Sequence, residues 1–374
     1  MKKVFPLLVL CFTIISLLSC SKDDLTVIDN NNSSGEIQLN TFFDLKEIKD
    51  GFIISGVNDS KVTISKLDIN FNTIWRKDNY EWGNLFSEGG WGGAFYSVDV
   101  VNVLQNENGN FICFCSIMEG TDVILHSVLI VTLDKIGNEI NRIELENNVL
   151  INVIKTNDNG YLLFGNSLIK LNSDFSKAWE NDDQNYIFSG ANINPTDDHG
   201  FAVTGTWNSE QVFLQKFDES GSNQWTKRNY NQKPFNDLGY DLYQMANDGF
   251  LIIGRTRNII EPWDMNCLII RTDNAGDTIW TKKFGKESDE WLEKFIYASE
   301  DDFIIKETIG FSDNPTHKTI LVRITGNGEI TESKEISSFE KLFFTTSGYF
   351  VKAEKTGNNI ISLSKAQFHD LFEK

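Results

Sequence analysis

Tryptophan is the side chain through which this chain of 374 residues, which contains nine tryptophans, is best equipped to recognise a ligand. Flat aromatic faces suit sugar rings and peptide side chains, and neighbouring glycines let a backbone approach a ligand closely, as in EWGNLFSEGGWGGAFY (81–96). Four tryptophans stand in polar or glycine-rich segments and are our candidate ligand-binding residues: Trp82, Trp91, Trp207 and Trp263. The alternative is that these rings only cover neighbouring parts of the fold.

Histidine offers little catalytic or metal-binding chemistry here. The four histidines are His126, His199, His317 and His369, and none has a Glu or Cys at metal-ligand spacing. The chain also lacks a Gly-x-Ser-x-Gly elbow, a phosphate-binding glycine loop and a dinucleotide fingerprint. We therefore predict no catalytic residue, no metal ligand and no cofactor. Calcium at an acidic loop is the alternative that the composition leaves open.

Carboxylates are abundant, with 53 acidic residues against 34 basic ones and a net charge of −19. Adjacent acids such as Asp182-Asp183 and Asp301-Asp302 could serve glycoside hydrolysis, which needs two carboxylates about 5–10 Å apart across a sugar. In so acidic a chain, however, such pairs are expected by chance. An acidic surface repels nucleic acid and anionic lipid headgroups, so neither is an expected partner.

Degenerate repeats supply the elements that must position these side chains. The segments DGFIISG (50–56), NGYLLFG (159–165), HGFAVTG (199–205) and DGFLIIG (248–254) align closely, and three weaker copies begin near residues 108, 301 and 347. Their turn positions, 51, 109, 160, 200, 249, 302 and 348, are 40 to 58 residues apart. Blades of a β-propeller have this period, and the Asp-Gly and Asn-Gly dipeptides suit hairpin turns.

Each repeat contains four expected strands. An apolar strand precedes the turn, as at 150–156 and 240–246, and three more follow it. The last repeat lacks its fourth strand, but GEIQL (35–39) resembles the missing one. We therefore predict an all-β fold over residues 35–374, a seven-bladed β-propeller of four-stranded blades closed by the N-terminal strand.

The fourth strand of a repeat carries a recurrent tryptophan at Trp75, Trp179, Trp225 and Trp280, while weaker repeats place Asn141 and Glu332 there. This pattern resembles the tryptophan docking of quinoprotein-like propellers. More specifically, the chain resembles secreted bacterial β-propeller lipoproteins with the repeat DGGFIIAG … LIKLDxxGxxxWxK. The resemblance implies the fold and no single activity. The basic residues in register at the ends of third strands are expected to pair locally with acids of the turns: Lys66, Lys170, Lys216, Arg271 and Arg323.

The N-terminus opens MKKVFPLLVLCFTIISLLSC, two lysines and an apolar run of signal-peptide length that ends at Cys20. Leu18-Ser19-Cys20 resembles the lipobox of bacterial lipoproteins, which implies that residues 1–19 form a signal peptide and that Cys20 is acylated. Residues 20–34 are then a lipidated flexible tether. Ser21-Lys22-Asp23-Asp24 resembles the surface-export signal of Bacteroidetes lipoproteins, so we expect a lipid anchor in the bacterial outer membrane and a propeller exposed at the cell surface.

Length variation between repeats favours one face as the binding surface. The loops between second and third strands and the crossovers between blades vary widely, and both sets emerge on the same face of a propeller, conventionally the top. We expect a non-catalytic propeller that binds a glycan, a peptide or a partner protein there. The alternatives are a glycan-cleaving hydrolase or lyase with top-face carboxylates and a structural component of an envelope complex. Cys113, Cys115 and Cys267 are expected to be buried thiols.

Overall fold

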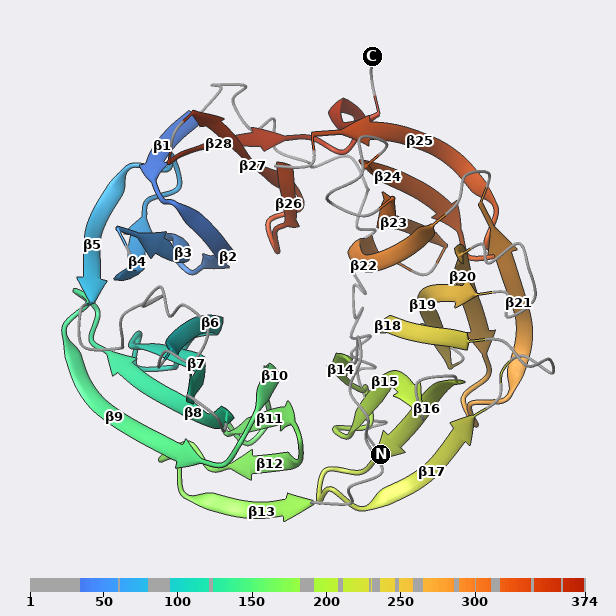
Figure 1. The fold of residues 1–374 in the computed structure, drawn as a ribbon, viewed down its shortest axis with the longest axis horizontal. Helices are drawn as coiled ribbons and strands as arrows, with labels where there is room; N and C mark the ends of the chain where they lie inside the picture. Colours follow the sequence, from blue (N-terminus) through green and yellow to red (C-terminus); the bar gives the residue numbers. More distant parts are fainter. Residues whose placement is uncertain are drawn as a thin grey trace, which may run out of the picture. The chain divides into compact units, whose positions relative to one another are not determined.

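The protein forms seven antiparallel sheets of four strands each, arranged as a ring of blades (Figure 1), which confirms the predicted all-β, seven-bladed propeller. The computed structural model describes residues 34–59, 61–79, 95–120, 124–181, 192–207, 211–228, 230, 236–245, 249–257, 265–285, 289–299, 301–310, 317–337, 340–357 and 359–372. Within these ranges η1 (His369–Leu371) is a single 3-10 turn. No helix in the described part of the chain is long and apolar enough to cross a bilayer.

The strands of each blade follow one another from the innermost to the outermost. Blade 1 comprises β2 (Thr41–Ile48), β3 (Gly51–Asn58), β4 (Lys61–Leu67) and β5 (Thr73–Asn79). Blade 2 comprises β6 (Phe95–Gln105), β7 (Phe111–Gly120), β8 (Ile124–Leu133) and β9 (Glu139–Glu146). Blade 3 comprises β10 (Leu150–Lys155), β11 (Tyr161–Gly165), β12 (Leu168–Leu171) and β13 (Lys177–Asn181). Blades 4 and 5 comprise β14 (Asn192–Pro195), β15 (Phe201–Trp207), β16 (Gln211–Phe217) and β17 (Asn223–Arg228); β18 (Asn236–Gln244), β19 (Phe250–Arg257), β20 (Met265–Thr272) and β21 (Thr278–Phe284). Blade 6 comprises β22 (Glu290–Ala298), β23 (Asp302–Ile309), β24 (Lys318–Thr325) and β25 (Ile330–Ile336), and blade 7 comprises β26 (Glu340–Phe344), β27 (Phe350–Gly357), β28 (Ile360–Ala366) and β1 (Ser34–Gln38).

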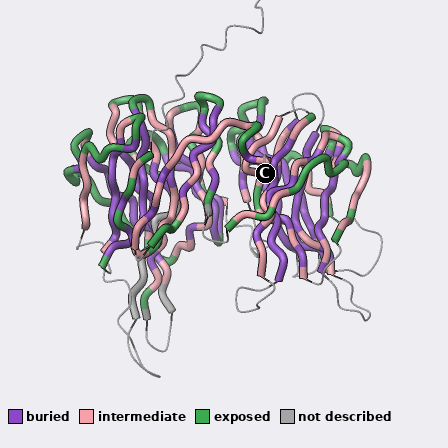
Figure 2. The backbone as a smooth tube through the Cα atoms, turned by 90° about the horizontal axis from the view of Figure 1, so that it is seen from above, coloured by how far each residue is buried: buried purple, intermediate pink, exposed green. Residues whose placement is uncertain are grey.

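The core lies between adjacent blades. The second strands carry buried apolar residues near their starts because neighbouring blades cover both of their faces, and in blade 1 all eight residues of β3 are buried. The fourth strands face water, as the mostly exposed pattern of β9 shows. Figure 2 shows this division between buried interior strands and exposed outer backbone. One core cluster joins Ile53 and Val62 of blade 1 to Cys113 and Val131 of blade 2. The propeller is therefore stabilised by blade-to-blade burial.

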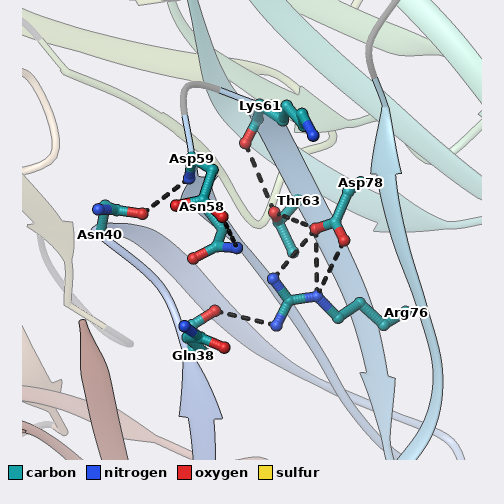
Figure 3. A network of polar contacts seen from close by, with 8 residues as sticks. All are labelled: Gln38, Asn40, Asn58, Asp59, Lys61, Thr63, Arg76 and Asp78. Carbon is teal, nitrogen blue, oxygen red and sulfur yellow. Dashed lines mark hydrogen bonds and ion pairs between the residues drawn. The ribbon is translucent and has the colours of Figure 1, made fainter.

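The N-terminal strand closes the ring, as predicted. β1 pairs antiparallel with β28, in a register that runs from Ser34 opposite Ser364 to Gln38 opposite Ile360. The guanidinium of Arg76 on β5 donates to the Gln38 carbonyl oxygen at 3.0 Å and is paired with Asp78 (Figure 3). Blade 7 is thus completed by β1 and tied to the outer strand of blade 1.

Aspartate side chains fix the turns between third and fourth strands. In blade 1, Oδ1 of Asp68 accepts from the backbone N–H groups of Asn70 at 2.8 Å and Asn72 at 2.9 Å. Asp134 and Asp273 make the same two bonds in blades 2 and 5. Such local bonds satisfy N–H groups that a tight turn leaves unpaired, which explains the aspartate of the repeat.

The basic residues in register pair with turn acids of their own blade, as predicted. The ion pairs are Lys66–Asp50 at 2.6 Å, Lys170–Asp158 at 2.7 Å, Lys216–Asp198 at 2.8 Å and Arg323–Asp302 at 2.8 Å. Partial burial acts to raise the pKa of Asp158, but hydrogen bonds from Lys170, Thr156 and Gly160 outweigh it and lower this pKa to about 2. The acid that would face Arg271, Asp248, lies outside the described residues.

The recurrent tryptophans dock onto the next blade. Each ring packs on a glycine of the turn between the third and fourth strands of that blade, where φ is positive: Trp75 on Gly137, Trp179 on Gly221, Trp225 on Gly276 and Trp280 on Gly328. The Trp75 indole N–H also donates to the Lys135 carbonyl oxygen at 2.9 Å. Trp75 lies edge-on to Phe111, the first residue of the second strand, with ring centroids 5.6 Å apart.

The tryptophan covers a niche formed by the turn between the third and fourth strands and the first aromatic residue of the second strand. Where the preceding blade supplies no tryptophan, another aromatic ring covers this niche. Blade 2 has Asn141 at the tryptophan position, so it supplies no ring to blade 3. In blade 3, Phe175 stands at the turn position that glycine occupies in other blades, with φ of 68°, and its ring stacks on Tyr161 with centroids 5.5 Å apart. Phe71 of blade 1 does the same, with φ of 67°, against Phe52 at 5.1 Å. In blade 7, Phe368 lies 5.9 Å from Phe350. Different aromatic residues therefore fill the niche in these blades, and a comparison of the repeats by residue identity does not reveal that they are equivalent.

Candidate binding site on the innermost strands

A ring of polar side chains lines the innermost strands, one from each blade. Each faces the residue three positions after the first aromatic residue of the second strand, for example Asn102 opposite Phe114 and Lys294 opposite Lys306. The seven members of this polar ring are Asp44, Asn102, Asn152, Asn192, Asp241, Lys294 and Lys341. Because they share one register position, they lie at one depth of the propeller.

β-Bulges aim these side chains. In five blades the pairing between first and second strands shifts by one residue immediately before the ring position, which leaves Phe43, Val101, Ile151, Tyr240 and Glu293 without a direct partner. In two of these blades the ring side chain accepts the next backbone N–H, at 2.7 Å for Asn152 and 2.8 Å for Asp241. Asn192 of blade 4 makes the same bond at 2.8 Å, although the described pairing of that blade has no register shift. The bulge and the polar residue therefore form one local unit.

Hydrogen bonds connect the polar ring from blade to blade. Lys46 donates to Asn102, whose amide donates to the Val153 carbonyl at 3.1 Å. Asn152 then donates to Asn192 at 2.5 Å, and Asn192 donates to Asp241 at 2.6 Å. Asp241 finally accepts the Phe295 backbone N–H of blade 6 at 2.9 Å. Hydrogen bonds thus link each blade to the next from blade 1 to blade 6, with the backbone of Val153 joining the two segments of the series.

Asp241 is the buried carboxylate of this series. Burial raises the pKa of Asp241 to about 6, against hydrogen bonds from Phe295, Asn192 and Leu242 that favour the ionised form. A carboxyl group that loses its proton near pH 6 makes the polar ring sensitive to mild acid.

Between blades 6 and 7 the Lys294 ammonium lies over the Phe343 ring, 5.6 Å from its centroid, beside a cavity of about 260 Å³. The lining combines three lysines and two acids with apolar side chains: Phe43, Asp44, Glu293, Lys294, Ile296, Lys306, Leu321, Ile336, Lys341, Leu342 and Phe343. These residues come from blades 1, 6 and 7. A cavity lined by apolar side chains and a few polar groups is the usual form of a small-molecule site.

The acids of the cavity differ in how they are compensated. Glu293 accepts from Lys306 at 2.6 Å and from Thr308, and although burial acts to raise the pKa of Glu293, these bonds lower it. Burial raises the pKa of Asp44 against the opposing charges of Lys46, Lys294 and Lys341. One carboxylate is therefore held ionised while the other is biased toward its protonated form.

Two lysines of the cavity lining, Lys294 and Lys341, are exposed to solvent. Desolvation by nearby protein atoms nevertheless lowers the pKa of Lys294, although the charge of Asp44 opposes this shift. Burial, followed by the charge of Lys294, also lowers the pKa of Lys341. Lys341 donates to the carbonyl oxygens of Phe42 at 2.9 Å and Phe43 at 3.3 Å. Two ammonium groups thus face one small cavity.

The sequence-predicted tryptophans are not part of this cavity as far as the structure describes them. Trp207 is half-buried at the end of β15 in blade 4, and the Arg228 guanidinium lies over its ring, 3.4 Å from the centroid. Trp82, Trp91 and Trp263 lie outside the described residues, as does Cys20. Their roles stay predictions.

Sequence reasoning missed a cluster of possible metal ligands between blades 5 and 6. The ligand atoms of buried Cys267, Glu290 and Glu307 lie within 4.8 Å of one another. The Cys267 thiol donates to Glu307 at 3.2 Å, and burial raises the pKa of this thiol as well as that of Glu307, the latter to about 6. A thiol that keeps its proton is not yet a metal ligand. The predicted absence of a metal stays a prediction.

Comparisons with known proteins define the fold class. No family model and no curated protein sequence matches this chain. BBS1N, in a crystal structure of its complex with ARL6DN, is similar with a TM-score of 0.50 and 7% identity, over 90% of this chain and 94% of that one. Raptor from Chaetomium thermophilum gives 0.49 and 13%, over 90% and 29% of the chains, and a DUF4221 member from Bacteroides vulgatus gives 0.40 and 10%, over 88% and 95%. The likeness to BBS1N shows the propeller fold alone, and this fold suggests a binding or scaffold role.

Proposed function

We propose that this chain is a lipid-anchored protein of the bacterial outer membrane, exposed at the cell surface, whose propeller binds a glycan, a peptide or a partner protein without catalysis. The cavity between blades 1, 6 and 7 carries this proposal, because it joins charged and apolar groups on strands of a closed ring. Of the two acids there, Glu293 already accepts hydrogen bonds from Lys306 and Thr308. Because this carboxylate is engaged within the protein, its geometry favours a binding site over a catalytic one.

The lipid anchor is supported by the N-terminal pattern. Two lysines, an apolar run and Leu18-Ser19-Cys20 stand in the order that lipid modification requires. After removal of residues 1–19, the charge of the chain becomes −21, so attraction to anionic headgroups cannot hold it on a membrane. Two acyl chains can, since each buried methylene contributes about 0.8 kcal/mol.

A rival function, cleavage of a glycan, has one specific observation in its favour. Asp44 and Glu293 line the same cavity, and their pKa values are shifted in opposite directions. Glycosidases use such a pair, one carboxyl group protonated and the other ionised. Under this rival, Asp44→Asn and Glu293→Gln would abolish product release from a bound glycan. A binding protein releases no product in either form.

Two measurements test the proposal. The full chain is expressed in a bacterial host with a clickable fatty acid, and Cys20→Ala is expected to lose both the acyl label and membrane retention. The purified chain is then profiled on a glycan array and used as bait for envelope proteins. Retention of Cys20→Ala with full labelling would remove the lipoprotein assignment, and conversion of any captured glycan would remove the non-catalytic one.

A further inference from the structure

The cavity between blades 1, 6 and 7 gathers lysines in a chain that is otherwise strongly acidic. The ionisable groups that line the cavity are Lys294, Lys306, Lys341, Asp44 and Glu293, so this lining carries an excess of one positive charge when all are ionised. Lys306 is neutralised by Glu293 at 2.6 Å. The excess charge therefore belongs to Lys294 and Lys341, which both interact with Asp44, while Asp241 and Glu293 also attract Lys294.

Neither of these two lysines has the carboxylate partner that the lysines at the ends of third strands have. Among the described residues, Lys294 and Lys341 make no ion pair with a carboxylate within 4.0 Å; Lys294 lies over Phe343, and Lys341 binds two backbone carbonyls. Lys66, Lys170 and Lys216, by contrast, each pair with a turn aspartate. Two ammonium groups that repel one another and, in the described part of the chain, lack a carboxylate partner within 4.0 Å are suited to contact an anionic ligand.

We infer that the cavity binds a carboxylate group of a small acidic sugar, with Lys294 and Lys341 as its cationic contacts. This inference rests on the proposed binding function and names its ligand class. The excess of one positive charge matches a carboxylate better than a phosphate group, which carries about −1.5 to −2. Asp44, biased toward its protonated form, is placed among the same lysines and can donate a hydrogen bond to the bound carboxylate.

Size and lining restrict the ligand further. A volume of about 260 Å³ is just below the usual range of about 300–1,000 Å³ for ligand sites, so the cavity suits one sugar unit and not an extended chain. Phe43 and Phe343 line it beside the lysines, and an aromatic face next to a cation suits a ring that has one charged and one apolar side. A uronate, a sugar ring that bears a carboxylate, combines these features.

The test is isothermal titration of the full chain, purified in detergent, with glucuronate, glucose and inorganic phosphate. Binding of glucuronate is expected to exceed that of glucose and phosphate, and Lys294→Gln and Lys341→Gln should each weaken it by about tenfold, as expected for loss of a charged contact. Lys177→Gln is the matched control, because Lys177 is an exposed lysine of outer strand β13 and its loss changes the net charge equally.

Each remaining result has a defined meaning. Equal or tighter binding of phosphate overturns the carboxylate assignment, and unchanged glucuronate affinity in both lysine variants overturns the site. If another glycan or protein binds the chain but glucuronate does not, this inference fails while the proposed function stands. If the profiling finds no binding partner and glucuronate also fails to bind, both fail. Denaturation of the Lys294→Gln protein distinguishes a structural role of Lys294 from a ligand-binding role. Substitution of a ligand-binding lysine should leave the stability of the free protein unchanged or increased, and a clear loss of stability would contradict the inference.

Discussion

Substitution of glycine at the tryptophan docking position should destabilise the propeller far more than the same substitution at a free turn. Gly221 and Gly348 both have positive φ, 80° and 84°. Alanine at either site incurs about 1–2 kcal/mol of left-handed backbone strain. A Cβ at Gly221 would lie 2.6 Å from Cη2 of Trp179, whereas one at Gly348 would meet nothing within 4 Å. Displacing a packed ring typically costs about 1–3 kcal/mol more, and this is the expected difference between Gly221→Ala and Gly348→Ala.

Equilibrium urea denaturation, followed by far-UV circular dichroism, measures both variants. A double-mutant cycle adds Trp179→Ala and the double variant Trp179→Ala/Gly221→Ala. The difference in unfolding free energy between these two gives the cost of Gly221→Ala without the indole, which should fall to that of Gly348→Ala. Equal free energies of unfolding for the two single variants would refute the reasoning, as would a cost of Gly221→Ala that persists without Trp179. Either result would mean that the indole does not limit the space at this turn.

The remaining predictions concern closure, pH and the loops. Deletion of residues 35–40 should prevent folding or lower the thermal midpoint strongly, because it removes most of β1 and exposes the edge of β28; an equally stable truncation in a thermal melt contradicts ring closure. Asp241 has a folded-state pKa of about 6, above its ordinary 3.8, so its contribution to stability is full below pH 4 and is lost as pH rises to about 6. The free energy of unfolding of the wild type should thus fall by up to about 3 kcal/mol relative to Asp241→Asn over this range in urea titrations, and parallel pH profiles would contradict it. Trp82→Ala and Trp91→Ala should each lower affinity for the ligand found by profiling, and full affinity in both would exclude this loop as a binding site.

The fold was predictable because its determinants are local. Asp68, Asp134 and Asp273 each fix a turn through bonds to residues two and four positions later, so the repeat is legible in short stretches of sequence. Closure was predictable for the same reason, since GEIQL resembles the fourth strand that the last repeat lacks. Phe175 and Phe71 were not recognised as docking residues, because they reach the niche from the blade they cover and not from the preceding blade.

The polar ring was missed because its members differ in type and precede the motif that aligns the repeats. A position-based signal does exist: six members stand nine residues before the first aromatic residue of the second strand, and Asp44 stands eight before Phe52. The bulge hides this signal, because the extra residue interrupts the alternation that marks a strand. The clustering of Lys294 and Lys341 with Asp44 depends on closure of the ring, which brings blade 1 beside blade 7.

The composition of the polar ring explains how a nearly symmetric scaffold can have one local site. Asn102, Asn152 and Asn192 occupy three successive blades, and an amide both donates and accepts, so these side chains can extend a hydrogen-bonded series. Lysine only donates, and two adjacent lysines cannot satisfy one another. The series of bonds therefore runs from blade 1 through the amides to Asp241 and the Phe295 N–H of blade 6, and its continuation at Lys294 and Lys341 requires an acceptor. The carbonyl oxygens of Phe42 and Phe43, which bind Lys341, and the carboxyl group of Asp44 supply part of that need, and an anionic ligand in the adjoining cavity would supply the rest.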